Sequence, residues 1–239
     1  MKHYILLGLF VLGCVSAAPL ELPSVPVPVP IPAVANVHSV DVSAARRLDL
    51  TVLSWVSRPD ATGKAKLRQE PTEIAGGCVV AFVRNGWVYG VTAEHCVRAE
   101  MLTMRVAGND VEVVERSVPA DLAVIRWRAT PGEVYTPARW ANPVLGSRVV
   151  NTAWLEWQFN IHTRRVSRHL GPGNVSLIED GWVGITCPTR VGCSGSPVFD
   201  MDGAVVGIVS RRAAGCDSFG YAADGREAQK LLATVPADK

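Results

Sequence analysis

The sequence lacks three features that would point to large classes of protein: a strong net charge, long apolar runs and internal repeats. Its 24 Lys+Arg and 22 Asp+Glu residues give a formal net charge of only +2 at pH 7. Without a long basic run, this balance gives no electrostatic reason to expect a nucleic-acid-binding protein. After residue 18 no apolar run approaches the roughly 20 residues of a membrane-spanning helix, which excludes a polytopic membrane protein. No segment recurs at a fixed period.

The cysteines lack the spacing of a metal site. There is no Cys-x-x-Cys pair, and no pair of histidines lies beside a cysteine, so we expect neither a zinc ion nor any other cofactor. Without Cys14, which lies in an N-terminal apolar run, five cysteines remain: Cys78, Cys96, Cys187, Cys193 and Cys216. Because five is odd, at least one of them is unpaired or is paired outside the chain. Disulfides in an oxidising compartment fit this set better than a metal.

Residues 1–18 have the pattern of a secretory signal peptide. Lys2 and His3 precede an apolar run that ends in small residues at Ala17 and Ala18, as at a cleavage site. An uncleaved run of this length could instead anchor the chain in a membrane, so we expect a secreted or membrane-associated protein. In residues 19–36 proline alternates with aliphatic residues, which favours an extended linker.

The sequence is rich in turn residues between short apolar runs, with 21 glycines and 16 prolines. From Cys78 onward, Asn-Gly and Asp-Gly pairs separate runs of Val, Ile and Trp, a pattern that indicates β-hairpins. Residues 37–73 carry one apolar stretch, Leu48–Val56, whose structure the pattern leaves open. Asp224 and Glu227 form a capping-box pattern that predicts one C-terminal helix. We expect strands around 79–84, 87–92, 101–106, 111–116, 122–127, 147–155, 161–168, 175–179, 182–186, 197–200 and 204–210.

Three short motifs carry the residues of one hydrolytic chemistry. His95 ends a predicted strand in Thr-Ala-Glu-His-Cys, Asp121 begins another, and Ser194 precedes a hairpin in Gly-Cys-Ser-Gly-Ser-Pro. Each residue alone has an ordinary structural explanation in a loop or turn. Together they supply a hydroxyl nucleophile, an imidazole that takes its proton, and a carboxylate that orients the imidazole. Glycine at 192 would let the amides of Gly192 and Ser194 point together at a developing oxyanion.

In this order, Thr-Ala-x-His-Cys, Asp-Leu-Ala-Val and Gly-x-Ser-Gly-x-Pro resemble the motifs of the chymotrypsin-like serine proteases. Gly207-Ile208-Val209-Ser210 also resembles the segment of that family that pairs with the substrate backbone. The resemblance covers residues 74–236. It implies an all-β fold of two antiparallel six-stranded β-barrels, with a boundary near 130–146, a C-terminal helix and a site in the cleft between the barrels. The implied activity is that of a serine endopeptidase acting on polypeptides, with His95 as base, Asp121 as its partner and Ser194 as nucleophile.

Within this family, Thr189-Arg190-Val191-Gly192-Cys193-Ser194-Gly195 most resembles the nucleophile motif of sobemovirus and polerovirus polyprotein proteases, Thr-x-x-Gly-x-Ser-Gly. The compact spacing of the three motifs agrees with that subgroup. Cys78 and Cys96 instead flank the base as the histidine-loop disulfide does in secreted cellular members. A viral and a cellular origin both stay open, and the nucleophile motif favours the viral one.

The resemblance also implies two disulfides. A bond between Cys78 and Cys96 would hold the loop of His95 and, in the chain-entropy model, would contribute about 3 kcal/mol. A bond between Cys187 and Cys216 would brace the substrate pocket and leave Cys193 free.

The resemblance places the walls of the substrate pocket at residues 188–190 and 210–212. Neither segment contains an acidic residue that could neutralise a Lys or Arg side chain of the substrate. Thr189 and Ser210 can hydrogen-bond a carboxylate or an amide, and Arg211 and Arg212 can supply positive charge. We therefore expect cleavage after Glu or Gln, although both arginines could equally point into solvent.

Two other functions compete with an endopeptidase. A protease-like binding protein that has lost its activity would be expected to show a broken triad, and here all three positions are filled. An esterase of the α/β-hydrolase type would need the order Ser, Asp, His and a Gly-x-Ser-x-Gly motif, and the sequence has neither. The natural substrate and the oligomeric state are not predicted.

Overall fold

The computed structural model describes residues 39–60, 62–98, 101–160 and 163–237. They belong to one compact unit, Asn36–Lys239. The predicted signal peptide or anchor and the whole of the predicted linker lie outside the described residues. Among the residues that are described, no helix is long and apolar enough to cross a membrane.

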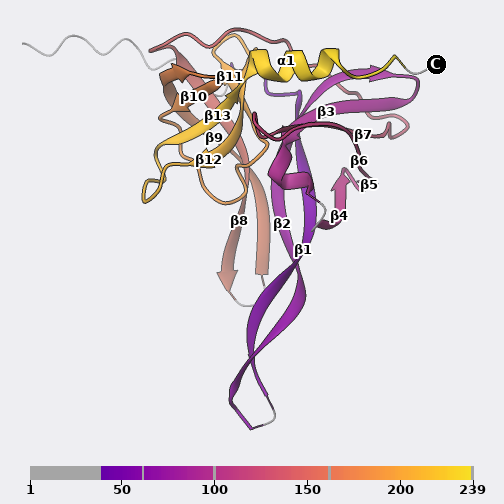
Figure 1. The fold of residues 1–239 in the computed structure, drawn as a ribbon, viewed down its shortest axis with the longest axis vertical. Coiled ribbons are helices and arrows are strands. Elements are labelled where there is room, and N and C mark those ends of the chain that lie inside the picture. Colours follow the sequence, from indigo (N-terminus) through magenta and orange to yellow (C-terminus); the bar gives the residue numbers. More distant parts are fainter. Residues whose placement is uncertain (1–38, 61, 99–100, 161–162, 238–239) are drawn as a thin grey trace, which may run out of the picture. The chain divides into compact units, whose positions relative to one another are not determined.

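A seven-stranded antiparallel sheet forms the first half of this unit (Figure 1). Its strands lie in the order β5-β4-β1-β2-β3-β7-β6. They are β1 (Ala45–Pro59), β2 (Ala65–Arg84), β3 (Trp87–Ala93), β4 (Met101–Val106), β5 (Asn109–Asp110), β6 (Glu112–Ser117) and β7 (Leu122–Arg128). The strands β1 and β2 pair from Ala45 opposite Val79 to Pro59 opposite Ala65, so their hairpin extends well beyond the other strands. The apolar stretch Leu48–Val56, which the sequence left open, therefore lies in β1.

A closed six-stranded barrel forms the second half, in the order β10-β13-β12-β11-β8-β9. Its strands are β8 (Arg148–Asn160), β9 (Thr163–Glu179), β10 (Trp182–Ile185), β11 (Pro197–Asp200), β12 (Val205–Arg212) and β13 (Gly220–Asp224). The predicted boundary near 130–146 falls on the segment between β7 and β8, which contains no named strand. The all-β, chymotrypsin-like fold class is confirmed, with the difference that the first half is an open sheet of seven strands.

The single described α-helix, α1 (Gly225–Ala233), lies where the capping pattern predicted it. The Asp224 carboxylate accepts a hydrogen bond from the Arg226 amide at 2.8 Å, as an N-cap residue does. Glu227 does not complete a capping box, because the Asp224 amide donates to the Gly181 carbonyl oxygen at 2.9 Å; the Glu227 carboxylate binds Lys230 at 2.7 Å.

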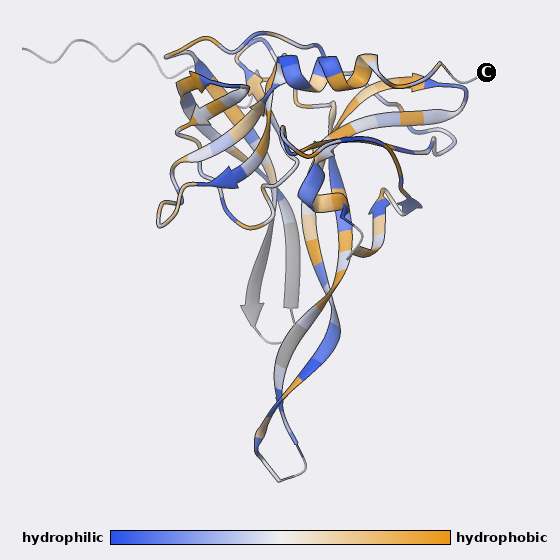
Figure 2. Ribbon diagram, in the orientation of Figure 1, coloured by the Kyte–Doolittle hydropathy of each residue, from blue (hydrophilic) through white to orange (hydrophobic). Residues whose placement is uncertain are grey.

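The sheet, the barrel and α1 share one hydrophobic core. Apolar and polar residues alternate along many of the strands (Figure 2), which leaves one face of each for the interior. The largest buried cluster includes Val79 and Tyr89 of the sheet, Phe199 and Ile208 of the barrel, and Ala228 and Leu231 of the helix. This shared core fixes the two halves of the unit against each other.

Gly90 in β3 lies in a closely packed part of the sheet. A Cβ atom there would lie 2.9 Å from the Trp127 ring and 3.0 Å from the Val79 carbonyl oxygen. Trp127 is fully buried. We therefore expect Gly90→Ala to lower the free energy of unfolding by about 1–3 kcal/mol, as overpacking does, measured by urea denaturation. Gly86→Asn is the control, because the φ of 74° suits asparagine and nothing lies within 4 Å. Equal stability of the two variants would contradict the prediction.

Candidate active site

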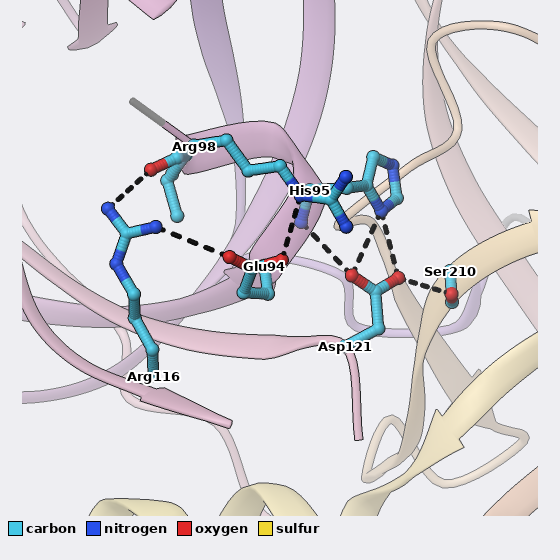
Figure 3. A network of polar contacts seen from close by, with 7 residues as sticks. Glu94, His95, Arg98, Arg116, Asp121 and Ser210 are labelled. Carbon is cyan, nitrogen blue, oxygen red and sulfur yellow. Dashed lines mark hydrogen bonds and ion pairs between the residues drawn. The ribbon is translucent and has the colours of Figure 1, made fainter. Parts of the chain in front are cut away.

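A 3-10 turn and a β-turn bring His95 and Asp121 together (Figure 3). His95 lies in η2 (Glu94–Val97), which follows β3 directly, and Asp121 precedes β7. The imidazole Nδ1 lies 2.8 Å and 3.1 Å from the two carboxylate oxygens, and the His95 amide donates to Oδ1 at 3.0 Å. Asp121 has a φ of 49°, a left-handed conformation that Asp adopts more readily than most residues. The carboxylate thus holds both the ring and the backbone of His95.

Ser210 on β12 completes the surroundings of this carboxylate. Its hydroxyl donates a hydrogen bond to Asp121 Oδ2, across the junction between barrel and sheet. Burial alone would raise the pKa of Asp121, but hydrogen bonds from His95 and Ser210 hold it below its usual value. The hydrogen bond to Asp121, followed by one to Cys96, raises the pKa of His95 to about 10 against the effect of burial. The pair therefore favours a charged imidazolium beside a charged carboxylate.

Ser194 lies on a loop that contacts both halves of the unit. Its carbonyl oxygen accepts a hydrogen bond from the Gly77 amide of β2 at 2.8 Å. Its hydroxyl lies 3.5 Å from the Ser210 carbonyl oxygen, which is at the limit of a hydrogen bond. Within the described part of the chain, it has no hydrogen bond to His95. Ser210 therefore lies between the hydroxyl of Ser194 and the carboxylate of Asp121.

The amides of Gly192 and Ser194 are available to a ligand. Neither donates a hydrogen bond to another described residue. Gly192 has a φ of 96°, and a Cβ atom there would lie 2.6 Å from the Trp154 carbonyl oxygen. Only glycine satisfies both conditions. The loop can therefore present unpaired amide donors, as an oxyanion site requires.

A cavity of about 130 Å³ opens beside Ser194, and all four predicted substrate-binding residues line it. The hydroxyl of Thr189, however, donates to the Phe219 carbonyl oxygen at 3.1 Å, and that of Ser210 binds Asp121. Each of these hydroxyl protons is therefore already used within the protein.

The three arginines that line this cavity also have partners. Arg211 stacks over the Trp182 ring, with 4.4 Å between Cζ and the ring centroid. Arg212 binds Asp217 at 2.6 Å, and Arg190 lies 3.7 Å from the same carboxylate. The sequence analysis did not identify Asp217, because it lies outside the two segments that the resemblance assigned to the pocket. Its charge offsets part of the positive charge expected there.

The two expected disulfides are absent from the structure, in which all five described cysteines are free. A Cβ atom at Gly76 would lie 3.7 Å from Cys96 Sγ, so Gly76 occupies a position facing Cys96. Cys78 lies in the same core cluster as Cys96, and its pKa is raised to about 12 by burial.

The second expected pair is separated by its environments. Cys187 is fully buried in the same cluster as Cys193, whereas Cys216 lies on a partly exposed loop beside Ser218. Cys187 therefore shares its core cluster with Cys193 and not with Cys216. Over the described ranges, no group of three or more His, Cys, Asp or Glu side chains could hold a metal ion.

Solved structures of known proteins share the fold of this chain. Structures with a similar fold include the serine endoprotease from Yersinia pestis, at 15% identity and a TM-score of 0.56, covering 80% of this chain and 63% of that one. The HtrA-type protease AlgW, solved with a decapeptide, is 17% identical with a TM-score of 0.61, covering 83% of this chain and 65% of that one. The chain thus spans less than two thirds of the length of either structure. No curated protein matches the sequence.

The comparison with protein families is more specific than the similarity to these structures. The pattern of the trypsin-like peptidase domain matches residues 77–208, a range that contains His95, Asp121 and Ser194. Because this match covers more than half of the sequence, the chain belongs to the trypsin-like peptidase domain family.

Proposed function

We propose that the protein is a serine endopeptidase in which His95, Asp121 and Ser194 form the catalytic triad. The observation that carries this proposal is the hydrogen-bonded pair of His95 and Asp121, which Ser210 connects to the loop of Ser194. Membership of a peptidase family supports the reaction class.

The proposed reaction begins when unprotonated His95 takes the proton of the Ser194 hydroxyl as this attacks a substrate carbonyl carbon. The carbonyl oxygen becomes an oxyanion, which accepts hydrogen bonds from the amides of Gly192 and Ser194. Asp121 holds the imidazole by Nδ1 and stabilises the imidazolium. His95 then gives its proton to the leaving amine, and an acyl-enzyme remains on Ser194. Water, activated by the same imidazole, releases the acid product and restores the hydroxyl.

We propose polyprotein processing as the setting of this activity. The motif from Thr189 to Gly195, with its likeness to viral polyprotein proteases, supports this, and so do the free thiols of the structure. A secreted cellular protease is the alternative, in which residues 1–18 would act as a signal peptide.

The first prediction concerns the nucleophile. Ser194→Ala removes the attacking hydroxyl, so turnover of a peptide substrate should fall by about 10³-fold or more with the fold intact. A fluorophosphonate should label the wild-type protein at Ser194, located by mass spectrometry, and should not label the variant. Thr234→Ala, which removes the hydroxyl of the C-cap residue of α1, is the control and should leave turnover unchanged. Labelling of Ser194→Ala would show that another residue is the nucleophile.

The second prediction concerns pH. His95 must be unprotonated to act as a base, and its pKa is raised above the usual 6.5. We therefore expect kcat/KM to rise with pH through a midpoint well above 6.5. In Asp121→Asn, the largest cause of the raised pKa is removed while burial, which lowers it, remains. The midpoint should then fall, together with a loss of activity on the order of 10³-fold. A midpoint that stays unchanged in Asp121→Asn would refute the assigned partnership.

The third prediction concerns the residue before the cut. We propose a preference for Glu over Gln, because Arg190, Arg211 and Arg212 place more positive charge around the cavity than Asp217 offsets. Reversing both charges, Arg211→Glu with Arg212→Glu, should weaken cleavage after Glu by roughly tenfold or more, the scale of one charge-assisted contact. Peptide-library cleavage mapped by mass spectrometry measures this, with Lys230→Glu on α1 as the control. Cuts mainly after Lys or Arg would contradict the proposed selectivity.

A further inference from the structure

The residue before His95 is a buried glutamate that the proposed reaction does not use. The Glu94 side chain is only 6% exposed, whereas the side chains of its partners, Arg98 and Arg116, are 50% and 38% exposed. Its carboxylate lies 3.0 Å from Arg98 Nε and 3.3 Å from Arg116 Nη1 (Figure 3). Burial of an unpaired carboxylate costs free energy, so Glu94 needs a partner of opposite charge. The two guanidinium groups supply the partner.

The contacts of Glu94 connect the element of His95 to the strands that fix Asp121. The Glu94 amide donates to the Asp121 carbonyl oxygen at 3.0 Å. Arg116 lies on β6 opposite Ala123, two residues beyond Asp121 in the chain. Its Nη2 donates to the Val97 carbonyl oxygen at 2.6 Å. Arg116 therefore holds both the first and the last residue of η2, and His95 lies between them.

Neither element would hold its conformation unaided. The helix η2 has four residues, and its N-cap residue makes no side-chain hydrogen bond. Short 3-10 turns have poor hydrogen-bond geometry and depend on their surroundings. Asp121 has the positive φ noted above, and contacts with surrounding residues are needed to hold such a conformation. The pairing of Glu94 with Arg116 supplies such a contact to η2, and the Glu94 amide supplies one to the turn of Asp121.

We propose that Glu94, acting through Arg116, is a positioning residue that holds the imidazole of His95 in register with the carboxylate of Asp121. This inference rests on the proposed function, because it assigns a role within the same triad. Glu94 is not a catalytic residue, since it contacts neither the nucleophile nor the imidazole through any hydrogen bond in the described part of the chain.

The test is a set of variants with two readouts that a role in stability alone would not change. Glu94→Gln keeps the shape of the side chain and removes its charge. We expect kcat to fall about tenfold with KM within about twofold, because misalignment affects the chemical step and not substrate binding. In proton NMR, the downfield resonance of the His95 Nδ1 proton, which reports the hydrogen bond to Asp121, should weaken or shift.

Variants at Arg116 separate positioning from folding. Arg116→Gln should reproduce both effects of Glu94→Gln, and Arg116→Lys, which keeps the charge, should restore much of kcat and the resonance. The Arg116 side chain is partly exposed, so these variants remain informative if Glu94→Gln fails to fold. Glu112→Gln is the matched control. Glu112 lies at the other end of the same strand, opposite Arg126, which it binds at 2.8 Å.

Wild-type kcat and an unchanged resonance in folded Glu94→Gln would overturn the inference. A lower kcat with an unchanged resonance would also overturn it, because the effect would then not pass through His95 and Asp121. The resonance can be measured whether or not the chain cleaves peptides. Failure of the proposed function, seen as wild-type protein without hydrolysis or fluorophosphonate labelling, is therefore distinguishable from failure of the positioning role.

Discussion

The close approach of the nucleophile loop to β2 is the constraint on which the rest of the structure depends. Gly77 donates its amide to the Ser194 carbonyl oxygen, and a Cβ atom at Gly77 would lie 2.6 Å from Ser196 Cα. Glycine at 77 therefore removes the side chain that would separate the sheet from the barrel. The sheet carries the proposed base and its carboxylate, and the barrel carries the proposed nucleophile and Ser210. The shared core holds the two halves together, and this contact determines how closely the groups that each half contributes to the candidate site approach one another.

The buried and half-buried carboxylates discussed above all have hydrogen-bond or ion-pair partners. Asp121 accepts hydrogen bonds from His95 and Ser210, Glu94 binds two arginines, and Asp224 both caps α1 and binds Arg226. An unpaired charge at such depth would cost several kcal/mol, so these pairs determine which side chains can occupy the neighbouring positions. The same compensation keeps the carboxylate of Asp121 ionised beside the imidazole.

The parts of the site that the sequence predicted are those encoded in short segments. His95, Asp121 and Ser194 lie in motifs of a few residues, and the turn chemistry around them identified most strands. Long-range pairing was not predicted. The segment Leu48–Val56 had an ambiguous pattern, and its antiparallel pairing with the distant residues of β2 makes it a strand. The sequence assigned Ser210 to the wall of the pocket. In the structure the register of β12 shifts between Val209 and Arg211, and the Ser210 hydroxyl binds Asp121. Such a bulge changes the direction of a side chain without a mark in the local sequence.

The glycine at position 76 has a consequence for how the turn of His95 is held in place. Because Gly76 faces Cys96, no covalent bond at that point joins β2 to the turn of His95. Burial also raises the pKa of Cys78 and of Cys187 to about 12, so their reactive thiolate forms are scarce at neutral pH. The geometry of the site is then maintained by packing and hydrogen bonds alone. Among the described residues, a loss of core packing would therefore act directly on the position of His95, with no disulfide to oppose it.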